Sequence, residues 1–230
     1  MPKALKKLMM HKHPPNKVKQ THGKDSIYVY EGSPHLKKNE NFRWSVVKDN
    51  FLTEEECELL REHIYESCML GNPELDKRKK NKEVWDKYYK SKKTNVSIYD
   101  KGDETEFQWL VDRVWTTMKV ANQVYWKYDI DGLRSAIGLY YNEGEDPDGE
   151  LHSDFANGIG GNMDTTFKLT GLLFLNDDFE GGELEIIQGK VKPKTGSLLM
   201  FPAFAAHRVL QFSGADRFTM VFVVEGNTFV

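Results

Sequence analysis

The chain has 230 residues, of which 39% are hydrophobic and 29% charged, and its formal net charge is −3. This length suffices for one domain with a sizeable buried core. Residues 1–24 hold seven lysines and no acidic residue, so the rest of the chain is more acidic than the total suggests. Such a charge distribution excludes a general nucleic-acid binder.

The amino-terminal stretch 1–24 is rich in Lys and His and contains Pro14-Pro15. It offers little apolar surface to offset the entropy of ordering a chain, so we expect a basic, disordered tail. We find no apolar run long enough for a signal peptide or a membrane span. The sequence therefore predicts a cytoplasmic protein without a membrane anchor.

The two cysteines support the same location. Cys57 and Cys68 are the only cysteines and lie eleven positions apart on a predicted helix. A helix rises about 1.5 Å per residue, so their backbones would be roughly 16 Å apart, which is beyond the reach of a disulfide. We expect two reduced thiols, as in a reducing compartment.

Residues 25–132 are predicted to form a support region of one strand and two helices. Phe42 to Phe51 is the expected strand. Thr53-Glu-Glu-Glu56 has capping-box spacing and begins a helix over 53–68. The second helix is expected from Glu104 to Trp126, because apolar residues recur there at helical intervals. Its predicted apolar stripe consists of Phe107, Leu110, Val111, Val114, Met118 and Val124.

Between the two helices lies a basic and aromatic segment, residues 77–93. Nine basic residues stand there against two acidic ones, interleaved with Trp85, Tyr88 and Tyr89. One interpretation is a solvated loop whose aromatic side chains pack inward. The other is a surface for an acidic peptide or for single-stranded nucleic acid.

The second half of the chain, 133–230, is predicted to be β structure and to form one structural unit, 40–230, with the region before it. Short apolar runs alternate with Gly-containing turns, which is typical of a β-sandwich or barrel. Gly181-Gly182 is expected to be a turn with positive backbone φ angles. The predicted strands are Ser135–Glu143, Phe167–Leu175, Glu183–Ile187, Val191–Phe201, Ala206–Phe212 and Arg217–Glu225.

The stretch from Leu151 to Arg217 carries the residues with metal chemistry. On an extended strand, side chains at i and i+2 leave the same face, so His152 and Asp154 can reach one metal. If His207 arrives on another strand, two imidazoles and one carboxylate bind one side of the metal. The opposite positions stay open, which is the arrangement of non-haem Fe(II) oxygenases.

Arg217 suits the cosubstrate that such open positions accept. A 2-oxo diacid that chelates the metal leaves a second carboxylate pointing away, and a guanidinium can bind that carboxylate with two parallel hydrogen bonds. Whether Arg217 and His207 face the same way depends on the turn between them, because a slip of one residue turns every side chain to the other face. Arg208, which directly follows His207, should point to the other face.

An ordered set of motifs runs from about Leu133 to Val230. The motifs are His152-x-Asp154, Thr170 to Asn176, Gly181-Gly-Glu-Leu184, Pro193 to Ser197, Phe201-Pro202, His207-Arg-Val and Gly214-x-x-Arg217. This set resembles the prolyl 4-hydroxylase-type Fe(II)/2-oxoglutarate-dependent dioxygenases.

The resemblance implies a mainly β protein with packed helices (α+β), whose core is a double-stranded β-helix, or jelly roll, with the metal at its mouth. In similar enzymes a variable loop closes over the substrate, a role that segment 77–93 could take here.

The same resemblance assigns the site. His152, Asp154 and His207 are the implied metal ligands, and Arg217 is the implied anchor for the distal carboxylate of 2-oxoglutarate. Tyr141 takes the place of a cosubstrate-binding tyrosine of similar enzymes, since a phenol can hydrogen-bond a carboxylate.

Two alternatives within this implied site stay open. Tyr140 competes with Tyr141 for the cosubstrate-binding position. Phe174 stands where some relatives have a tyrosine that holds the distal carboxylate, and a phenyl ring cannot do so. Thr219 or Tyr141 would then have to compensate.

The implied activity is hydroxylation of an unactivated C–H, with Fe(II), 2-oxoglutarate and O2 as cofactors and succinate and CO2 as coproducts. The default substrate is a prolyl residue in a protein or peptide, and ascorbate (vitamin C) would keep the iron reduced. The presence of Asp154 argues for hydroxylation, because related halogenating enzymes lack this carboxylate.

Three alternatives remain. The substrate could be a free amino acid or another small molecule. A nucleic-acid oxidative demethylase is disfavoured, because it would be expected to carry a second arginine at the position of Val223. The third is a β-barrel metal protein that is not an oxygenase. An isomerase of this kind would have no special need for Arg217, and a non-enzymatic metal-binding β-barrel module would be expected to lack one of the ligands.

Overall fold

The computed structural model describes residues 18–20, 28–30, 40–70, 94–142, 150–157 and 165–227, except 188 and 193. The chain divides into two compact units, 1–40 and 41–230. The first contains β1 (Val18–Gln20) and β2 (Tyr28–Tyr30), which pair antiparallel. The rest of the predicted tail 1–24 and the basic segment 77–93 lie outside the described residues. The division of the second unit into a support region and a core from 133 onward stays a prediction.

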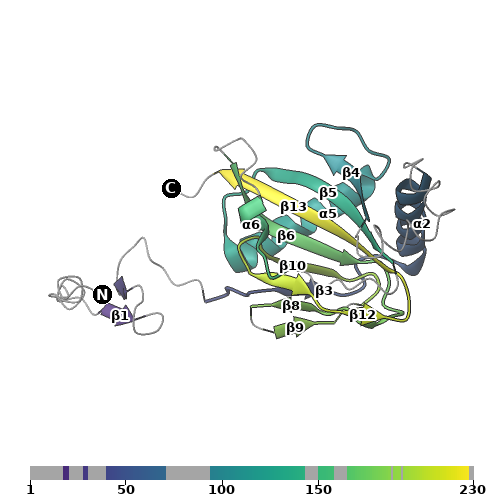
Figure 1. Ribbon diagram of the computed structural model, residues 1–230. Coiled ribbons are helices and arrows are strands. Elements are labelled where there is room, and N and C mark those ends of the chain that lie inside the picture. The colour runs from purple at the N-terminus through teal and green to yellow at the C-terminus, as the bar shows by residue number, and fades with distance from the viewer. Residues whose placement is uncertain are drawn as a thin grey trace. The chain divides into compact units, whose positions relative to one another are not determined.

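The second unit is built on a six-stranded antiparallel sheet (Figure 1). Its strand order is β3-β10-β6-β13-β5-β4, so the last long strand, β13, lies at the centre between β6 and β5. The strands are β3 (Val46–Lys48), β4 (Thr94–Asp100), β5 (Gly132–Tyr141), β6 (Thr165–Phe174), β10 (Leu198–Pro202) and β13 (Arg217–Asn227).

A smaller sheet forms the second β layer. Its strands are β8 (Leu184–Ile186), β9 (Gly189–Val191) and β11 (His207–Val209), in the order β11-β8-β9. A further pair joins β7 (Glu180–Gly181) to β12 (Phe212–Ser213). Two antiparallel layers with packed helices confirm the predicted fold, a mainly β protein with a double-stranded β-helix core.

Two helices pack on the six-stranded sheet, as the resemblance implied (Figure 1). They are α2 (Glu54–Leu70) and α5 (Gln108–Ala121), and α5 continues into a π-helical turn, η1 (Asn122–Trp126). The predicted capping box is present: Glu56 N donates to Thr53 Oγ1 over 3.2 Å, and Thr53 N donates to the Glu56 carboxylate over 3.0 Å. Among the described residues, no helix is long and apolar enough to cross a membrane.

Glycines let the helices approach the sheet closely. A Cβ on Gly138 of β5 would lie 2.6 Å from Ile64 Cγ1 of α2, and a Cβ on Gly171 of β6 would lie 3.2 Å from Met118 Sδ of α5. Ile64 and Met118 are both fully buried. The main hydrophobic core therefore lies between the helices and this face of the sheet.

The helix predictions need one correction. Five members of the predicted stripe on α5 and just before it are buried, but Val124 is 43% exposed. The π-helical turn that contains Val124 inserts an extra residue, which rotates the following side chains away from the expected face. The predicted first strand, 42–51, is also longer than the observed β3.

The strand predictions need two corrections. The predicted strand Val191–Phe201 is wrong, because β9 ends at Val191 and β10 begins only at Leu198. Gly196, with φ +72°, lies in the turn between them. The predicted strand Ala206–Phe212 is likewise divided between β11 and β12.

The predictions for the Gly181-Gly182 turn and for the two cysteines are confirmed. Gly181 and Gly182 have φ values of +80° and +67°, as expected for their turn. Cys57 and Cys68 are free thiols, and both are buried. Burial raises the pKa of each thiol to about 11, so both stay protonated at neutral pH.

Candidate active site

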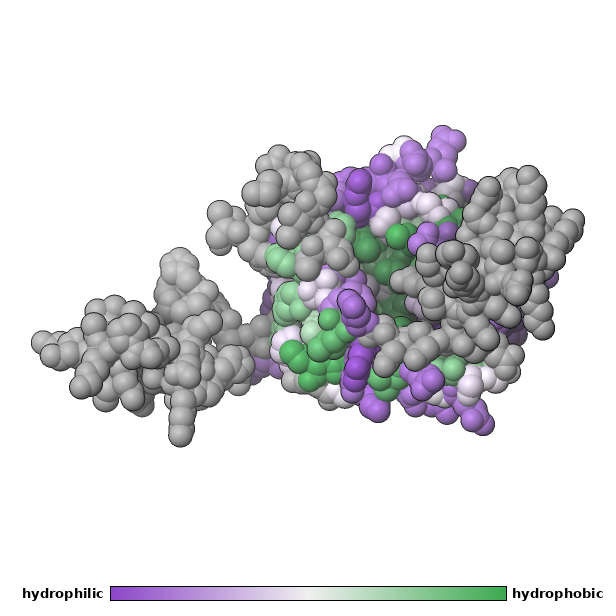
Figure 2. Space-filling view, in the orientation of Figure 1, coloured by the Kyte–Doolittle hydropathy of each residue, from purple (hydrophilic) through white to green (hydrophobic). Residues whose placement is uncertain are grey.

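Alternation along the central strand β13 separates two faces of the six-stranded sheet. Arg217, Thr219, Val221 and Val223 line a cavity of about 380 Å³, whereas Met220 and the other alternate residues join the helix-side core. The space-filling view shows a hollow with apolar side chains on one face of the molecule, bordered by hydrophilic residues (Figure 2).

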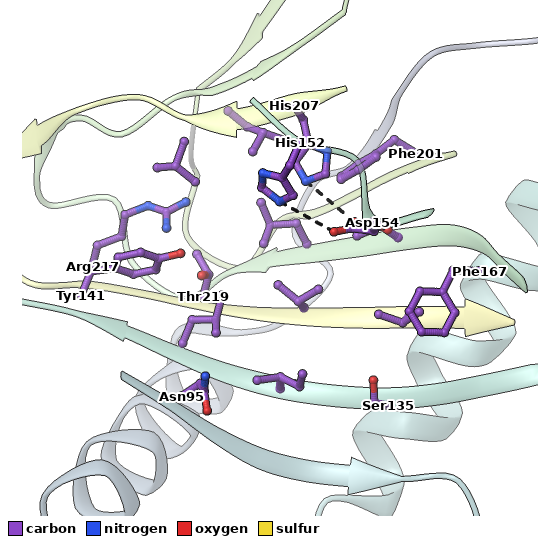
Figure 3. Close-up of a pocket in the computed structure, with 18 residues that line it drawn as sticks. Asn95, Ser135, Tyr141, His152, Asp154, Phe167, Phe201, His207, Arg217 and Thr219 are labelled. Atoms are coloured by element: carbon purple, nitrogen blue, oxygen red, sulfur yellow. Dashed lines mark hydrogen bonds and ion pairs between the residues drawn. The ribbon is translucent and has the colours of Figure 1, made fainter. Parts of the chain in front are cut away.

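The three predicted metal ligands come together at one side of this cavity (Figure 3). His152 and His207 form an isolated antiparallel bridge, with His207 N donating to His152 O over 2.8 Å. Their Nε2 atoms lie 3.8 and 3.7 Å from the carboxylate oxygens of Asp154. One donor atom from each residue lies within 4.8 Å of the other two, so the group can hold a metal ion.

Hydrogen bonds orient each ligand toward the centre of the group. Nδ1 of His152 lies 2.8 Å from the backbone oxygen of Glu150, and Nδ1 of His207 lies 2.8 Å from that of Ala205. Each Nδ1–H can therefore donate to a carbonyl, which leaves the lone pair of Nε2 for a metal. The Thr170 hydroxyl donates to Asp154 Oδ2 over 2.6 Å and fixes the carboxylate.

The sequence identified these three residues, but the predicted backbone of the pair His152 and Asp154 is wrong. Asp154 does not lie on a strand; it begins the short helix α6 (Asp154–Asn157). Phe155 N donates to Ala203 O over 3.1 Å and ties this turn to the end of β10. A helical turn, and not the i, i+2 alternation of a strand, brings the carboxylate back toward the two imidazoles.

Arg217 extends into the deep end of the cavity and is fully buried. Among the described residues, none of its three guanidinium nitrogens has a hydrogen-bond partner. Its Cζ lies 5.1 Å from the ring centre of Tyr141 and 6.0 Å from that of Phe179. Burial lowers the pKa of the guanidinium, and the neighbouring Tyr141 opposes this shift. An unpaired cation is costly to bury, so a bound anion would stabilise this guanidinium.

The structure distinguishes the two tyrosines. Tyr141 lines the cavity beside Arg217, and the two residues are paired across β5 and β13 (Figure 3). Tyr140 faces the helices, where its hydroxyl donates to Asp216 over 2.8 Å. Alternation on β5 therefore places only Tyr141 near the guanidinium.

The structure also locates the other residues that were predicted near Arg217. Thr219 lines the cavity, and its buried Oγ1 has no hydrogen-bond partner among the described residues. Phe174, which is paired with Thr219 across the strands, is fully buried in an apolar cluster. Arg208 lies outside the cavity lining, as expected, and pairs with Glu185 over 2.6 Å.

Several residues of the cavity had not been singled out from the sequence. Thr170 was quoted only as part of a motif, and Phe201, whose ring lies 4.8 Å from that of His207, only as part of Phe201-Pro202. Asn95 and Ser135 line the cavity from β4 and β5. Nothing in their local sequence marks these two, because only strand pairing brings them into the lining of the cavity.

Comparison with known proteins agrees with this geometry. Residues 139–224 match the model of the 2OG-Fe(II) oxygenase superfamily. No curated protein sequence matches the chain. The fold is similar to that of the viral collagen prolyl hydroxylase of Paramecium Bursaria Chlorella virus-1, with a TM-score of 0.56 and 14% identity over 80% of this chain and 97% of that one.

Two further solved structures share the fold. A prolyl-4-hydroxylase of Pseudomonas putida has a TM-score of 0.55 and 17% identity over 80% of this chain and 94% of that one. A prolyl 4-hydroxylase of Phytophthora capsici has a TM-score of 0.50 and 20% identity over 81% of this chain and 60% of that one.

The segment 139–224 thus matches the 2OG-Fe(II) oxygenase superfamily, and the jelly-roll fold and the three-residue group agree with that class. Such enzymes use Fe(II), 2-oxoglutarate and O2. The prolyl hydroxylases named above are 14 to 20% identical to this chain, so this similarity shows the shared fold.

Proposed function

We propose that this protein hydroxylates a prolyl residue in a protein or peptide, with succinate and CO2 as coproducts. The observation that carries the proposal is the buried guanidinium of Arg217, which has no hydrogen-bond partner among the described residues and shares a cavity with the group of His152, Asp154 and His207. An anionic cosubstrate that also binds a metal satisfies both features.

His152, Asp154 and His207 are the proposed iron ligands. Two imidazoles and one carboxylate suit Fe(II) and leave positions for a bidentate cosubstrate and O2. The iron supplies the oxidative chemistry when bound. The protein holds the ligands in place through Glu150 O, Ala205 O and Thr170, and its apolar cavity wall excludes water from the reacting centre.

Arg217 is the proposed anchor for the distal carboxylate of 2-oxoglutarate. Its guanidinium can donate two parallel hydrogen bonds to that group. Thr219 adds a hydroxyl from the same face of β13, and Tyr141 adds a phenol beside the guanidinium. Some similar enzymes have a tyrosine at the position of Phe174, whose ring here packs in the apolar core. The hydroxyls of Thr219 and Tyr141 would replace the hydroxyl of that tyrosine.

The choice of substrate rests on fold similarity and on the cavity. The similar solved structures are described as prolyl hydroxylases, which supports a peptide substrate. Val223 lines the cavity at the position where a demethylase of nucleic acids would be expected to have a second arginine. A free amino acid or another small molecule remains the alternative substrate.

Two further parts of the proposal concern the protein's surroundings. We propose a cytoplasmic location, which two free, buried cysteines support. We also propose that ascorbate keeps the iron reduced during turnover. Succinate formation in repeated cycles, measured with and without ascorbate, tests the second point.

An anaerobic titration tests the cosubstrate site without knowledge of the substrate. Apo-protein is titrated with Fe(II) and then with 2-oxoglutarate, and the visible charge-transfer band of the chelate is recorded. We expect a saturable band that disappears in His152→Ala. His63→Ala, a substitution on α2 outside the cavity lining, is the matched control and should retain the band. Bound iron without a band would refute the proposed site.

A further inference from the structure

The cavity floor extends sideways from the metal group across three strands. Thr170 of β6 is paired with Val223 of β13, which is paired with Ser135 of β5. All three line the cavity, and Thr170 binds Asp154. Neighbouring strands lie about 4.8 Å apart, so Ser135 lies roughly 10 Å from Thr170 along this row.

A second row begins beside the cosubstrate anchor. Thr219 of β13 is paired with Leu139 of β5, which is paired with Asn95 of β4. These three residues also line the cavity. β4 is the outermost strand of the sheet in the described part of the chain, and Asn95 is exposed. The floor therefore ends at two polar side chains, the exposed Asn95 of β4 and the half-buried Ser135 of β5, which together form its margin (Figure 3).

Between the metal group and this margin the floor is apolar. Ile137, Leu139, Val221 and Val223 form an aliphatic strip. Such a strip suits a compact apolar ring, whereas the amide of Asn95 and the hydroxyl of Ser135 each offer a donor and an acceptor. This combination matches a peptide: the ring of a proline lies on the strip, and the main-chain amides flanking it reach the margin.

The charge of the lining distinguishes a peptide from a free amino acid. A free amino acid carries a carboxylate that would need a cation, and the only Lys or Arg among the residues lining the described cavity is Arg217. Arg217 lies at the deep end and is assigned to the cosubstrate. The margin offers neutral groups, which suit the neutral amides of a peptide chain.

We propose that Asn95 and Ser135 bind the main chain of an extended peptide substrate and hold its proline on the aliphatic strip. The inference rests on the proposed function and adds to it the residues of this chain that bind the main chain of the peptide. Asn95 and Ser135 act as substrate-binding residues and have no part in holding iron or 2-oxoglutarate.

Steady-state kinetics of Asn95→Ala, Ser135→Ala and the double variant test the proposal. Succinate formation is measured with poly-L-proline, with mixed-sequence decapeptides containing a central proline, and with free L-proline. One neutral hydrogen bond contributes about 0.5–1.5 kcal/mol, so we expect each single substitution to raise the peptide KM about fivefold. The KM for 2-oxoglutarate and the anaerobic band should stay at wild-type values.

Two matched controls show whether the change in peptide KM is specific to the two side chains. Ser97→Ala changes a hydroxyl on the same edge strand that does not line the cavity, and it should leave the peptide KM unchanged. Ser135→Thr keeps the hydroxyl and should recover most of the lost peptide affinity. Melting temperatures should be equal for all variants, because Asn95 is exposed and Ser135 is only half-buried.

Other outcomes overturn the inference. A peptide KM that is unchanged in the double variant would show that the margin does not bind substrate. Turnover of free L-proline but of no peptide, or of neither while the band is intact, would refute a prolyl-peptide substrate. That result, or absence of the band in the wild-type protein, would refute the proposed function itself. An unchanged peptide KM with intact turnover would refute only the assignment of Asn95 and Ser135, so the two failures are distinguishable.

Discussion

The two faces of the six-stranded sheet are built from the same strands but differ in what they bury: apolar side chains on one face and, in the described part of the chain, unpaired polar groups on the other. On the helix-covered face, buried aliphatic residues pack against α2 and α5, and Gly138 and Gly171 remove side chains where the helices approach. On the cavity face, Arg217 and Thr219 are buried with side-chain polar atoms that have no partner among the described residues. One face is organised for stability, and the other keeps unpaired polar groups for a ligand.

This contrast implies that substitutions on the two faces should have separable effects. Changes on the cavity face should alter iron, cosubstrate or substrate binding while the protein remains folded. Changes on the helix face should lower the free energy of unfolding while the site remains intact. Four experiments test this separation, in order of decreasing size of the change that we expect.

His207→Ala should have the largest effect on function. Removal of one proposed ligand leaves two protein ligands for the metal, so we expect loss of the charge-transfer band and of detectable succinate formation. The fold should persist, since the side chain belongs to the cavity lining. Far-UV circular dichroism and the anaerobic titration together check this. A variant that keeps full activity would show that His207 is not a ligand.

Arg217→Met should separate stability from function most clearly. The substitution removes a buried guanidinium without a hydrogen-bond partner among the described residues and leaves an apolar side chain in its place, so the apo-protein should become more stable. Hydrogen bonds to charged groups contribute about 1.5–3 kcal/mol, so the 2-oxoglutarate KM should rise roughly 10- to 100-fold. Urea unfolding of the apo-protein and steady-state kinetics measure the two effects.

The result of Arg217→Met can contradict the assignment in a simple way. An unchanged 2-oxoglutarate KM would show that another group binds the distal carboxylate. Arg208→Met is the matched control, because this arginine lies outside the cavity lining and pairs with Glu185. It should leave the KM unchanged.

Gly138→Ala tests the helix face. The added methyl would lie 2.6 Å from Ile64 Cγ1, so α2 or the sheet must shift, and overpacking of this kind costs about 1–3 kcal/mol. Gly132→Ala on the same strand is the control, because no heavy atom lies within 4 Å of its added methyl. Urea unfolding should show a loss only for Gly138→Ala, and both variants should retain the charge-transfer band. Equal stabilities would contradict the close packing.

The smallest effect concerns the two thiols on the helix face. Burial raises the pKa of Cys57 and Cys68 from 9.0 to about 11, so the folded state favours the neutral thiols. Their contribution to stability is therefore complete below pH 9 and is lost as the pH rises from 9 toward 11. Unfolding midpoints at pH 8 and pH 10, compared with a Cys57→Ala, Cys68→Ala variant, measure this loss. Rapid reaction of both thiols with a disulfide reagent at pH 8 would contradict their burial.

Much of the fold could be predicted because local signals are strong in particular segments. The capping box at Thr53 and the apolar spacing after it predicted α2, and short apolar runs between Gly-containing turns predicted β5, β6 and β13 closely. The predictions failed where a local rule was broken: the π-helical turn leaves Val124 exposed, and the turn containing Gly196 interrupts a predicted strand. Such turns depend on how flanking elements pack, which local spacing does not encode.

Part of the site could likewise be predicted from the sequence, and part could not. The order and spacing of His152, Asp154, His207 and Arg217 permitted a site for iron and 2-oxoglutarate, and the resemblance carried by the longer set of motifs implied that site. The choice of Tyr141 over Tyr140, and the placement of Arg217 in the cavity, required the register of β5 and β13. A shift of one residue in this pairing would exchange the two faces of the sheet.

The motifs of the chain predicted an oxygenase, since the order of His152, Asp154, His207 and Arg217 suits that chemistry. Which other residues surround these four side chains is evident from the folded structure alone. Asn95 is separated from Thr219 by more than a hundred positions in the chain, yet both lie in one row across three strands. Hydrogen-bonded strand pairing creates such neighbours, and no local pattern of residue types records them.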